Sequence, residues 1–257
     1  MGSADSGKAN QEAAGASQPI QDLRASPGDT AGGSQQIQDL RRDFGRDSLT
    51  EELAGDDPFL LFGRWFDTAL DAGLRDANAF VLSTVDEANR PVSRVLLLKD
   101  YSPAGFVFYT NYASRKGSNL AENPHAAILF YWAEHERQVR IEGRVERVAR
   151  EESAAYFASR PRASQLGAHA SPQSQVLSDR SDLEKRFSDL EQQYGADAPI
   201  PLPEDWGGYR LQPGRIEFWQ GRSNRLHDRL EYTIVQAGSA SGSQAKAGAW
   251  TRVRLAP

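Results

Sequence analysis

The sequence contains no cysteine, one methionine and only four histidines among 257 residues. The missing thiols exclude disulfides, cysteine-ligated zinc, iron–sulfur clusters and a thiol nucleophile. The histidines, His125, His135, His169 and His227, lack the H-E-x-x-H spacing of a zinc hydrolase. We therefore expect no metal site.

Long apolar runs and a net positive charge are also absent. The mean hydropathy is −0.61, and without a run of about 18 apolar residues we expect no membrane span. Acidic residues outnumber Lys and Arg by 35 to 30, a formal charge of −5, so the basic field typical of nucleic-acid binding proteins is missing. The N-terminus shows no basic segment followed by an apolar stretch, which predicts a cytoplasmic protein without a secretory signal.

The first 36 residues are rich in Gly, Ser, Ala and Gln, and the first aromatic residue is Phe44. Such a segment cannot bury enough apolar surface to offset its chain entropy, so we predict a disordered tail over 1–36 and one domain over 37–257. Residues 17–24 (SQPIQDLR) recur at 34–41 as SQQIQDLR. Two copies are too few for a repeat fold, and we interpret them as a local duplication.

The rest of the sequence predicts many strands and few helices. Helices are expected from 57 to about 70, and over 114–122, 151–159 and 181–194. Strands are expected over 79–85, 93–99, 106–110, 126–132, 138–148, 209–211, 215–220, 229–236 and 250–255, with a flexible hairpin loop at 237–248. This order favours an α+β fold, mainly β, built on an antiparallel barrel, over a doubly wound sheet. No G-x-G-x-x-G or P-loop motif is present, which disfavours those nucleotide sites.

Cationic residues cluster at the ends of predicted elements, despite the negative total charge. Ser114, Arg115 and Lys116 open a helix directly after a strand, where free N–H groups, a hydroxyl and two cations make a phosphate site. The alternative is a solvated cationic turn, although cations are unfavourable at this end of a helix. Arg94 and Lys99 lie on another predicted strand, and their odd separation predicts that they face opposite sides. Either they contact two different ligands, or they are charged residues that protect an edge strand from pairing with another chain.

A third cluster lies in the segment 156–171. Tyr156 and Arg160 are four residues apart and share a helix face, and a proline ends that helix. With Arg162, and with Ser164 in the following loop, they form a second candidate phosphate site. The polar pair Gln173 and Ser174 downstream is compatible with an ordinary linker.

A fourth cluster follows the sequence EFWQG at 217–221. Arg225, His227 and Arg229 alternate in what we interpret as an extended segment, which puts them on one side. Like charges in this arrangement repel unless an anion lies between them. A lone histidine is usually structural, but one between two arginines points to function, and Trp219 offers a flat apolar surface nearby.

These four clusters, in this order, resemble the pyridoxamine (pyridoxine) 5′-phosphate oxidase family. The resemblance covers about residues 37–257 and is carried by RVLLLKDY (94–101), FYTNYASRKGSNLAENP (108–124), ERQVRIEG (136–143), YFASRPRASQLGAHAS (156–171) and IEFWQGRSNRLHDR (216–229). It implies a split β-barrel of the antiparallel six-stranded type, with FMN bound at the interface of a homodimer. The implied partners are small molecules, with no nucleic acid and no membrane.

The resemblance also implies roles for individual residues. The implied FMN-binding residues are Arg94, Val95, Leu96, Leu97, Leu98, Lys99, Tyr109, Thr110, Arg115, Lys116, Gln138, Gln173, Ser174, Trp219 and Arg229. The implied substrate-binding residues are Lys99, Tyr156, Arg160, Ser164, Arg225 and His227, with Arg41 and Phe44 at the N-terminus, and Arg225 and His227 are the implied catalytic residues. Family members often carry Arg-Arg-x-Tyr near the N-terminus, with a tyrosine that closes over the substrate. Here Phe44 stands at that position, so only a stacking role is expected.

The implied activity is FMN-dependent oxidation of pyridoxamine or pyridoxine 5′-phosphate to pyridoxal 5′-phosphate, a step of vitamin B6 salvage. A hydride leaves the substrate C4′ for flavin N5, and dioxygen takes up the electrons and yields hydrogen peroxide. Three alternatives remain open. They are another FMN-dependent reductase on the same barrel, a non-catalytic carrier of FMN or pyridoxal phosphate, and a nucleic-acid binding module, which the net charge opposes.

Overall fold

The computed structural model describes residues 43–235 and 248–257. The predicted tail, the duplicated segment, Arg41 and most of the predicted hairpin loop lie outside the described residues. The division of the chain into a tail and a domain from residue 37 therefore stays a prediction.

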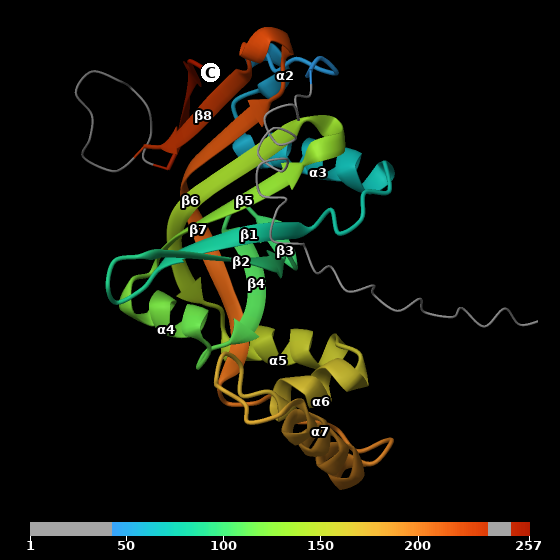
Figure 1. The fold of residues 1–257 in the computed structure, drawn as a ribbon. Helices are drawn as coiled ribbons and strands as arrows, with labels where there is room; N and C mark the ends of the chain where they lie inside the picture. Colours follow the sequence, from blue (N-terminus) through green and yellow to red (C-terminus); the bar gives the residue numbers. More distant parts are fainter. Residues whose placement is uncertain (1–42, 236–247) are drawn as a thin grey trace, which may run out of the picture. The chain divides into compact units, whose positions relative to one another are not determined.

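The described helices and strands follow the predicted order, with two corrections given below (Figure 1). Two short elements, the helix α2 (Glu51–Ala54) and the strand β3 (Asp100–Ser102), are additional to the prediction. The helices are α2 (Glu51–Ala54), α3 (Pro58–Asp71), α4 (Arg115–Glu122), α5 (Arg150–Ser159), α6 (Arg162–Ala170) and α7 (Arg180–Tyr194), with 3₁₀ turns η1 (Ala133–His135) and η2 (Ser223–Arg225). The strands are β1 (Ala79–Val85), β2 (Pro91–Leu97), β3 (Asp100–Ser102), β4 (Gly105–Asn111), β5 (His125–Trp132), β6 (Arg137–Arg147), β7 (Trp206–Gln220), β8 (Asp228–Ile234) and β9 (Trp250–Leu255).

The described strands form one sheet in which every pairing is antiparallel. The sheet curls in the order β2-β1-β5-β6-β7-β4-β3, and the β8-β9 hairpin extends it from β7. The first half of β7 pairs with β4 and its second half pairs with β8. The mixed α+β fold with a curled antiparallel sheet is therefore confirmed.

Helix α3 fills the inside of the curl with aromatic side chains. It begins where the sequence predicts, because the Asp57 carboxylate accepts hydrogen bonds from the first free N–H groups and Pro58 occupies the first turn. Phe62 is fully buried and contacts Phe106 and Phe130 at ring distances of 5.0 and 5.2 Å. The alternation of buried and partly exposed residues along β1 points one face of that strand into the same core.

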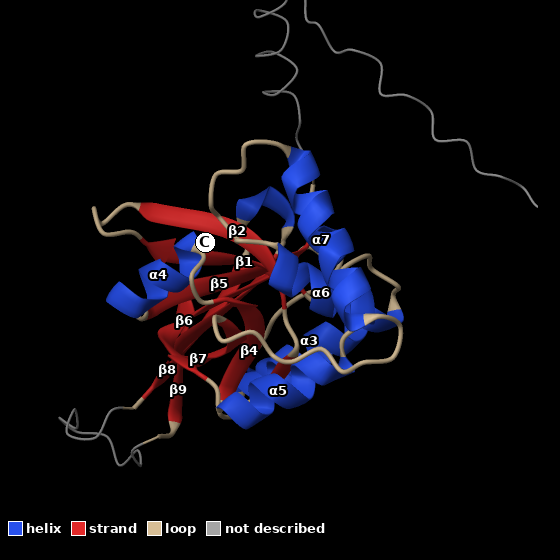
Figure 2. Cartoon of the chain, turned by 90° about the horizontal axis from the view of Figure 1, so that it is seen from below, coloured by secondary structure: helices blue, strands red, loops and turns tan. Residues whose placement is uncertain are grey.

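Helices α5, α6 and α7 pack together at the end of the sheet where β7 begins (Figures 1 and 2). Here the structure corrects two predictions. The segment after Pro161 is a helix, α6, rather than a loop, because a proline that ends one helix also suits the start of the next. The strands predicted at 209–211 and 215–220 are one strand, β7, which continues past Pro213 beside a bulge in its pairing with β6.

Candidate functional site

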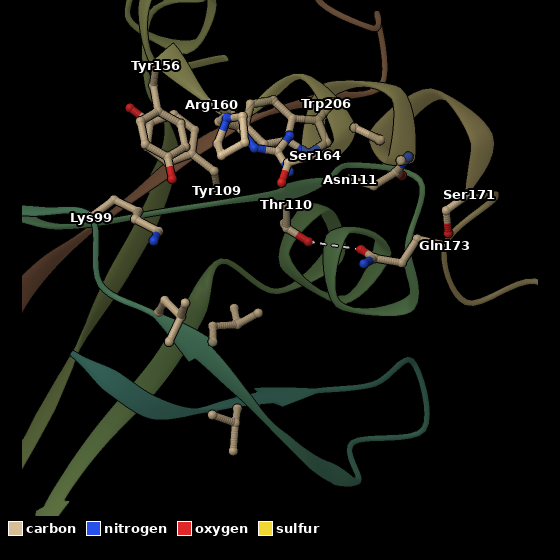
Figure 3. Close-up of a pocket in the computed structure, with 16 residues that line it drawn as sticks. Lys99, Tyr109, Thr110, Asn111, Tyr156, Arg160, Ser164, Ser171, Gln173 and Trp206 are labelled. Atoms are coloured by element: carbon tan, nitrogen blue, oxygen red, sulfur yellow. Dashed lines mark hydrogen bonds between the residues drawn. The ribbon is translucent and has the colours of Figure 1, made fainter. Parts of the chain in front are cut away.

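A cavity of about 650 Å³ lies where β2, β4, the start of β7 and helices α5 and α6 converge (Figure 3). Its volume lies within the range of small-molecule sites. One wall of the cavity is formed by the paired strands β4 and β7. Their pairing begins with Phe106 opposite Leu211 and ends with Asn111 opposite Trp206. The cavity is lined by Val95, Leu96, Leu97, Lys99, Tyr109, Thr110, Asn111, Tyr156, Arg160, Pro161, Ser164, Gly167, Ala168, Ser171, Gln173 and Trp206.

Aromatic rings stack along one side of the cavity. Tyr109 and Tyr156 lie 3.9 Å apart between ring centroids, and Trp206 lies 5.5 Å from Tyr109 in a nearly parallel plane. Burial, followed by the nearby Glu152 carboxylate, raises the pKa of Tyr109 to about 12. Its phenol is therefore neutral at physiological pH and remains a hydrogen-bond donor.

Arg160, Lys99 and Ser164 present polar groups to the same cavity (Figure 3). Burial lowers the pKa of Arg160, and its Nη1 atom is buried with no hydrogen-bond partner. Neither Arg160 nor Lys99 forms an ion pair in the described part of the chain. Two cations without a carboxylate partner are suited to bind an anion.

Lys116 forms a second cationic centre next to the cavity. Its Nζ donates to Ser114 Oγ at 3.1 Å and to Gln173 Oε1 at 2.9 Å, and Gln173 Oε1 also accepts from Thr110 Oγ1 at 3.0 Å. Burial, and then the charge of Arg94, lowers the pKa of Lys116 to about 8. An anion at this position would relieve the penalty, because it favours the charged ammonium.

Arg94 and Arg115 complete this centre. Arg94 donates to Thr84 Oγ1 at 2.8 Å and to the Leu82 carbonyl at 3.2 Å, and burial followed by Arg115 lowers its pKa. Strand β2 ends at Leu97, so Lys99 lies beyond it and the odd-separation argument for opposite faces does not apply. The two cations nevertheless have different surroundings, since Lys99 lines the cavity and the Arg94 guanidinium is bonded to Thr84 and Leu82.

The remaining predicted residues lie together at the far end of β7. His227 contacts Trp219 at 4.6 Å between ring centroids, and Phe44 packs edge-on against both, at 5.6 and 5.8 Å. The Arg222 backbone N–H donates to His227 Nδ1 at 3.0 Å, which places the proton of the neutral imidazole on Nε2. Burial, and then Arg225, lowers the pKa of His227, so this neutral form dominates at pH 7.

The predicted alternation of Arg225, His227 and Arg229 is wrong. Arg225 ends the turn η2 at a positive φ of 61°, so the segment is not extended there. Arg229 lies on β8 and pairs with the buried Glu217 carboxylate at 2.8 Å, which removes the need for an anion between the arginines.

Arg162 is a further correction. Its guanidinium donates to the carbonyl oxygens of Tyr194, the last residue of α7, and of Gly195 and Ala198 beyond it, and it does not line the cavity. Ser164 does line the cavity, from α6 rather than from a loop.

The predicted site residues thus fall into two groups. The first is at the cavity and the Lys116 centre: Arg94, Val95, Leu96, Leu97, Lys99, Tyr109, Thr110, Arg115, Lys116, Tyr156, Arg160, Ser164, Gln173 and Ser174. The second is at the other end of β7: Phe44, Gln138, Trp219, Arg225, His227 and Arg229. Leu98 is buried in the core, and Arg41 lies outside the described residues.

Sequence reasoning missed several residues of the cavity wall. Asn111, Gly167, Ala168 and Ser171 are small or polar residues with no pattern of their own. Trp206 could have been found from the sequence, because two glycines, Gly207 and Gly208, follow it and leave room for aromatic rings to pack closely. Any side chain at Gly208 would lie 2.7 Å from the Tyr109 ring, so this glycine allows the close packing at the cavity.

Two kinds of site are not found in residues 43–235 and 248–257. No three His, Asp or Glu side chains gather there in a way that would hold a metal ion. No helix in these ranges combines the length and the apolar character that a membrane span requires. The cytoplasmic location stays a prediction.

Comparison with known proteins gives matches over almost the whole described chain. Residues 66–194 match the family model described as pyridoxamine 5′-phosphate oxidase, and residues 206–257 match the pyridoxine 5′-phosphate oxidase C-terminal dimerisation region. The chain is 54% identical over 218 residues to the pyridoxine/pyridoxamine 5′-phosphate oxidase of Pseudomonas savastanoi pv. phaseolicola, covering 84% of this chain and 96% of that protein. It is 51% identical over 216 residues to that of Rubrobacter xylanophilus, covering 84% and 94%.

A solved structure supports the same assignment. The crystal structure of PhzG from Burkholderia lata 383, in complex with tetrahydrophenazine-1-carboxylic acid, aligns with a TM-score of 0.72 at 32% identity, covering 82% of this chain and 98% of that one. An FMN-binding, pyridoxamine 5′-phosphate oxidase-related protein from Nostoc punctiforme has the same fold, with a TM-score of 0.59 at 17% identity, covering 76% and 96%. The chain therefore belongs to the pyridoxine/pyridoxamine 5′-phosphate oxidase family.

Proposed function

We propose that this chain oxidises pyridoxine 5′-phosphate and pyridoxamine 5′-phosphate to pyridoxal 5′-phosphate, with FMN as cofactor and dioxygen as the final oxidant. The observation that carries the proposal is a pair of cationic centres without carboxylate partners, one at Arg160 and one at Lys116. Two phosphate monoesters, one on the substrate and one on FMN, supply the two anions that these centres lack.

The cofactor assignment rests on the donor set around Lys116. The buried ammonium, the Arg94 guanidinium and the exposed Arg115 at the start of α4 all favour a phosphate, and α4 adds the free N–H groups of its first turn. Gln173, which now accepts from Lys116, has an amide that also donates, so it can bond a phosphate oxygen. When bound, FMN supplies the acceptor for the hydride and passes the electrons to dioxygen.

Substrate binding is assigned to the cavity. Arg160 and Lys99 bind the phosphate, Ser164 donates its hydroxyl, and Tyr156 encloses them from α5. Charge-assisted hydrogen bonds of this kind contribute about 1.5–3 kcal/mol each. The unphosphorylated vitamin lacks this interaction and is expected to be a poor substrate.

The second group of residues is assigned to the neighbouring protomer of a homodimer. Cavity residue Trp206 and Trp219 lie on the same strand, separated by roughly 40 Å of extended chain, so one protomer does not bring Arg225 and His227 to its own cavity. The match of residues 206–257 to a dimerisation region supports a homodimer, as does the exposure of Val95, at 65%, on β2 at the sheet's edge. Arg225 and His227 of the partner subunit then orient the substrate ring.

The chemistry is a two-electron oxidation at the substrate carbon C4′. With pyridoxine 5′-phosphate, the carbinol loses two hydrogens to form the aldehyde, and dioxygen becomes hydrogen peroxide. With pyridoxamine 5′-phosphate, water replaces the nitrogen and ammonia leaves as well. The neutral His227 with its proton on Nε2, and the cation Arg225, provide a donor and a positive charge that position the reacting group.

A direct test is to purify the full chain, load it with FMN, and measure peroxide formed from pyridoxine 5′-phosphate and from unphosphorylated pyridoxine. Peroxide with the phosphorylated substrate, at a much lower KM than with pyridoxine, is expected. Flavin binding without peroxide would instead identify a carrier, and a chain that binds no FMN would overturn the proposal. Reduction of the bound flavin by NADPH, without turnover of either vitamer phosphate, would favour the reductase alternative.

The Arg160→Ala variant tests the phosphate site. Its KM for pyridoxine 5′-phosphate should rise by roughly tenfold to a hundredfold with a smaller change in kcat, because one charge-assisted interaction with the phosphate is lost. Arg162→Ala is the matched control, since that arginine faces the end of α7 and should leave KM unchanged. An equal KM for Arg160→Ala and the unchanged chain would contradict the assignment.

A further inference from the structure

Trp206 is a cavity residue to which neither the motifs nor the proposed roles assign a function. It is the first residue of β7, pairs in register with Asn111 on β4, and is only 6% exposed. The Arg150 side chain donates to its carbonyl oxygen at 2.7 Å, which fixes the backbone at the start of the strand. The indole is therefore held rigidly at the cavity wall.

The indole face lies against the Arg160 guanidinium. The Cζ atom of Arg160 is 4.7 Å from the centroid of the Trp206 ring, and Figure 3 draws both side chains. It is 5.6 Å from the centroid of the Phe157 ring, and both distances are within the range of cation–π attraction. No carboxylate pairs with Arg160 in the described residues, and its Nη1 atom has no partner. Aromatic faces thus take the place of the usual acid.

The same indole orders the other side chains of this wall. Its plane is within 13° of Tyr109 and within 7° of Tyr156, at ring distances of 5.5 and 6.2 Å. Phe157 meets it edge-on at 5.2 Å. Trp206 therefore contacts Arg160 directly and limits the positions available to Tyr156.

We propose that Trp206 is a positioning residue for phosphate recognition, which acts by holding the Arg160 guanidinium in the cavity without neutralising it. A carboxylate in this place would occupy the N–H donors that the substrate phosphate needs. An aromatic face attracts the cation through its quadrupole and leaves those in-plane donors available. The inference rests on the proposed function, because it assumes that Arg160 binds the substrate phosphate.

The test compares Trp206→Leu and Trp206→Phe in the full-length, FMN-loaded protein. The probe is 4-deoxypyridoxine 5′-phosphate, which carries the phosphate but no oxidisable group, and its Kd is measured by equilibrium dialysis. Trp206→Leu should raise this Kd, and the KM for pyridoxine 5′-phosphate, by roughly five- to thirtyfold. Trp206→Phe should restore much of the affinity. Neither variant should change kcat more than about twofold, since the residue acts before the chemical step.

A double-mutant cycle separates this role from simple packing. In an Arg160→Ala background, Trp206→Leu should raise the Kd less than about twofold, because the group it positions is gone. Unphosphorylated 4-deoxypyridoxine should bind all variants with similar affinity. A purely structural tryptophan would instead weaken both ligands, and would do so equally with and without Arg160, which would overturn the inference.

The outcomes also distinguish the inference from the proposed function. A chain that binds the phosphorylated probe but forms no peroxide refutes the oxidase proposal and leaves the cycle to judge Trp206. If Arg160→Ala weakens binding of the probe but Trp206→Leu leaves it unchanged, only the inference about Trp206 is refuted. If Trp206→Leu fails to fold, the same cycle is measured with Trp206→Phe. Its smaller ring should weaken phosphate binding less than Trp206→Leu would, and only when Arg160 is present.

Discussion

The two buried cations at this site, Lys116 and Arg160, contact uncharged partners rather than carboxylates. Lys116 donates to a hydroxyl and an amide oxygen, and Arg160 lies against aromatic rings. Burial lowers the pKa of both groups. A carboxylate would offset the cost of burial but would also compete with an incoming phosphate. Cations that lack a carboxylate partner therefore stay available to an anion. Arg140 and Arg229 differ, because both pair with the Glu217 carboxylate, at 2.6 and 2.8 Å.

FMN affinity is expected to depend on pH through Lys116, whose pKa is lowered to about 8. An anion binds the ammonium form, which is populated below this pH and is lost as the pH rises through it. The Kd for FMN should therefore rise by roughly tenfold or more between about pH 7 and 9.5. Quenching of FMN fluorescence on titration with the protein measures this.

Lys116→Arg is the control for that titration, because a guanidinium stays charged throughout this range. Its FMN affinity should be nearly flat with pH, whatever its absolute value. The same slope in Lys116→Arg and in the unchanged chain would show that another group governs the dependence.

At the scale of elements, the bulge between β6 and β7 lies where β7 changes its second partner strand from β4 to β8. The pairing register shifts between Glu142 and Gly143, and Pro213 lies opposite. A bulge bends a strand and increases its twist. Before the bend β7 pairs with β4 at the cavity, and after it β7 pairs with β8 near His227.

Gly143→Ala should destabilise the protein at this bulge. A Cβ there would lie 2.0 Å from the Gln212 carbonyl oxygen, and backbone atoms cannot move aside as a flexible side chain can. We expect a loss of about 1–3 kcal/mol in the free energy of unfolding, measured by urea denaturation. Gly214→Ala, next to the same bulge, is the matched control, because its nearest atom is 4.0 Å away. Equal stability of the two variants would contradict this account.

Element prediction succeeded where the signal was local. The Asp57-Pro58 start of α3 and the bounds of β1 and β9 follow from capping and alternation. It failed at α6, where Pro161 was interpreted as the start of a loop, and at β7, which was predicted as two strands. Pro161 lies between two helices, and Pro213 is accommodated at an irregular pairing, so in both places the partner element decided the outcome.

At the scale of the whole molecule, the site residues lie at opposite ends of β7, one group with Arg160 and the other with His227. In a two-fold symmetric dimer, each cavity can take its second group from the partner. Two sites per dimer would then each use both chains.

Mixing two inactive variants tests this arrangement. Arg160→Ala and Arg225→Ala should each be nearly inactive at low substrate concentration. Co-expressed in equal amounts, they should form heterodimers in which one of the two sites carries both native arginines, giving about a quarter of the normal activity per protein. Peroxide assays on the co-expressed and separately purified variants measure the recovery. Activity no greater than the sum of the separate variants would place Arg160 and Arg225 in the same protomer's site.

The sequence by itself determined the family, the α+β class and the identity of most cavity residues, because those depend on local motifs such as FYTNYASRK and YFASRPRAS. Only the tertiary structure decided which of those residues meet. The long β7 strand separates Arg225 and His227 from Arg160. Arg229 pairs with Glu217. The pairing of β7 with β4 places Trp206 against the Arg160 guanidinium. Contacts of this kind join residues far apart in the chain, and spacing along a sequence carries no information about them.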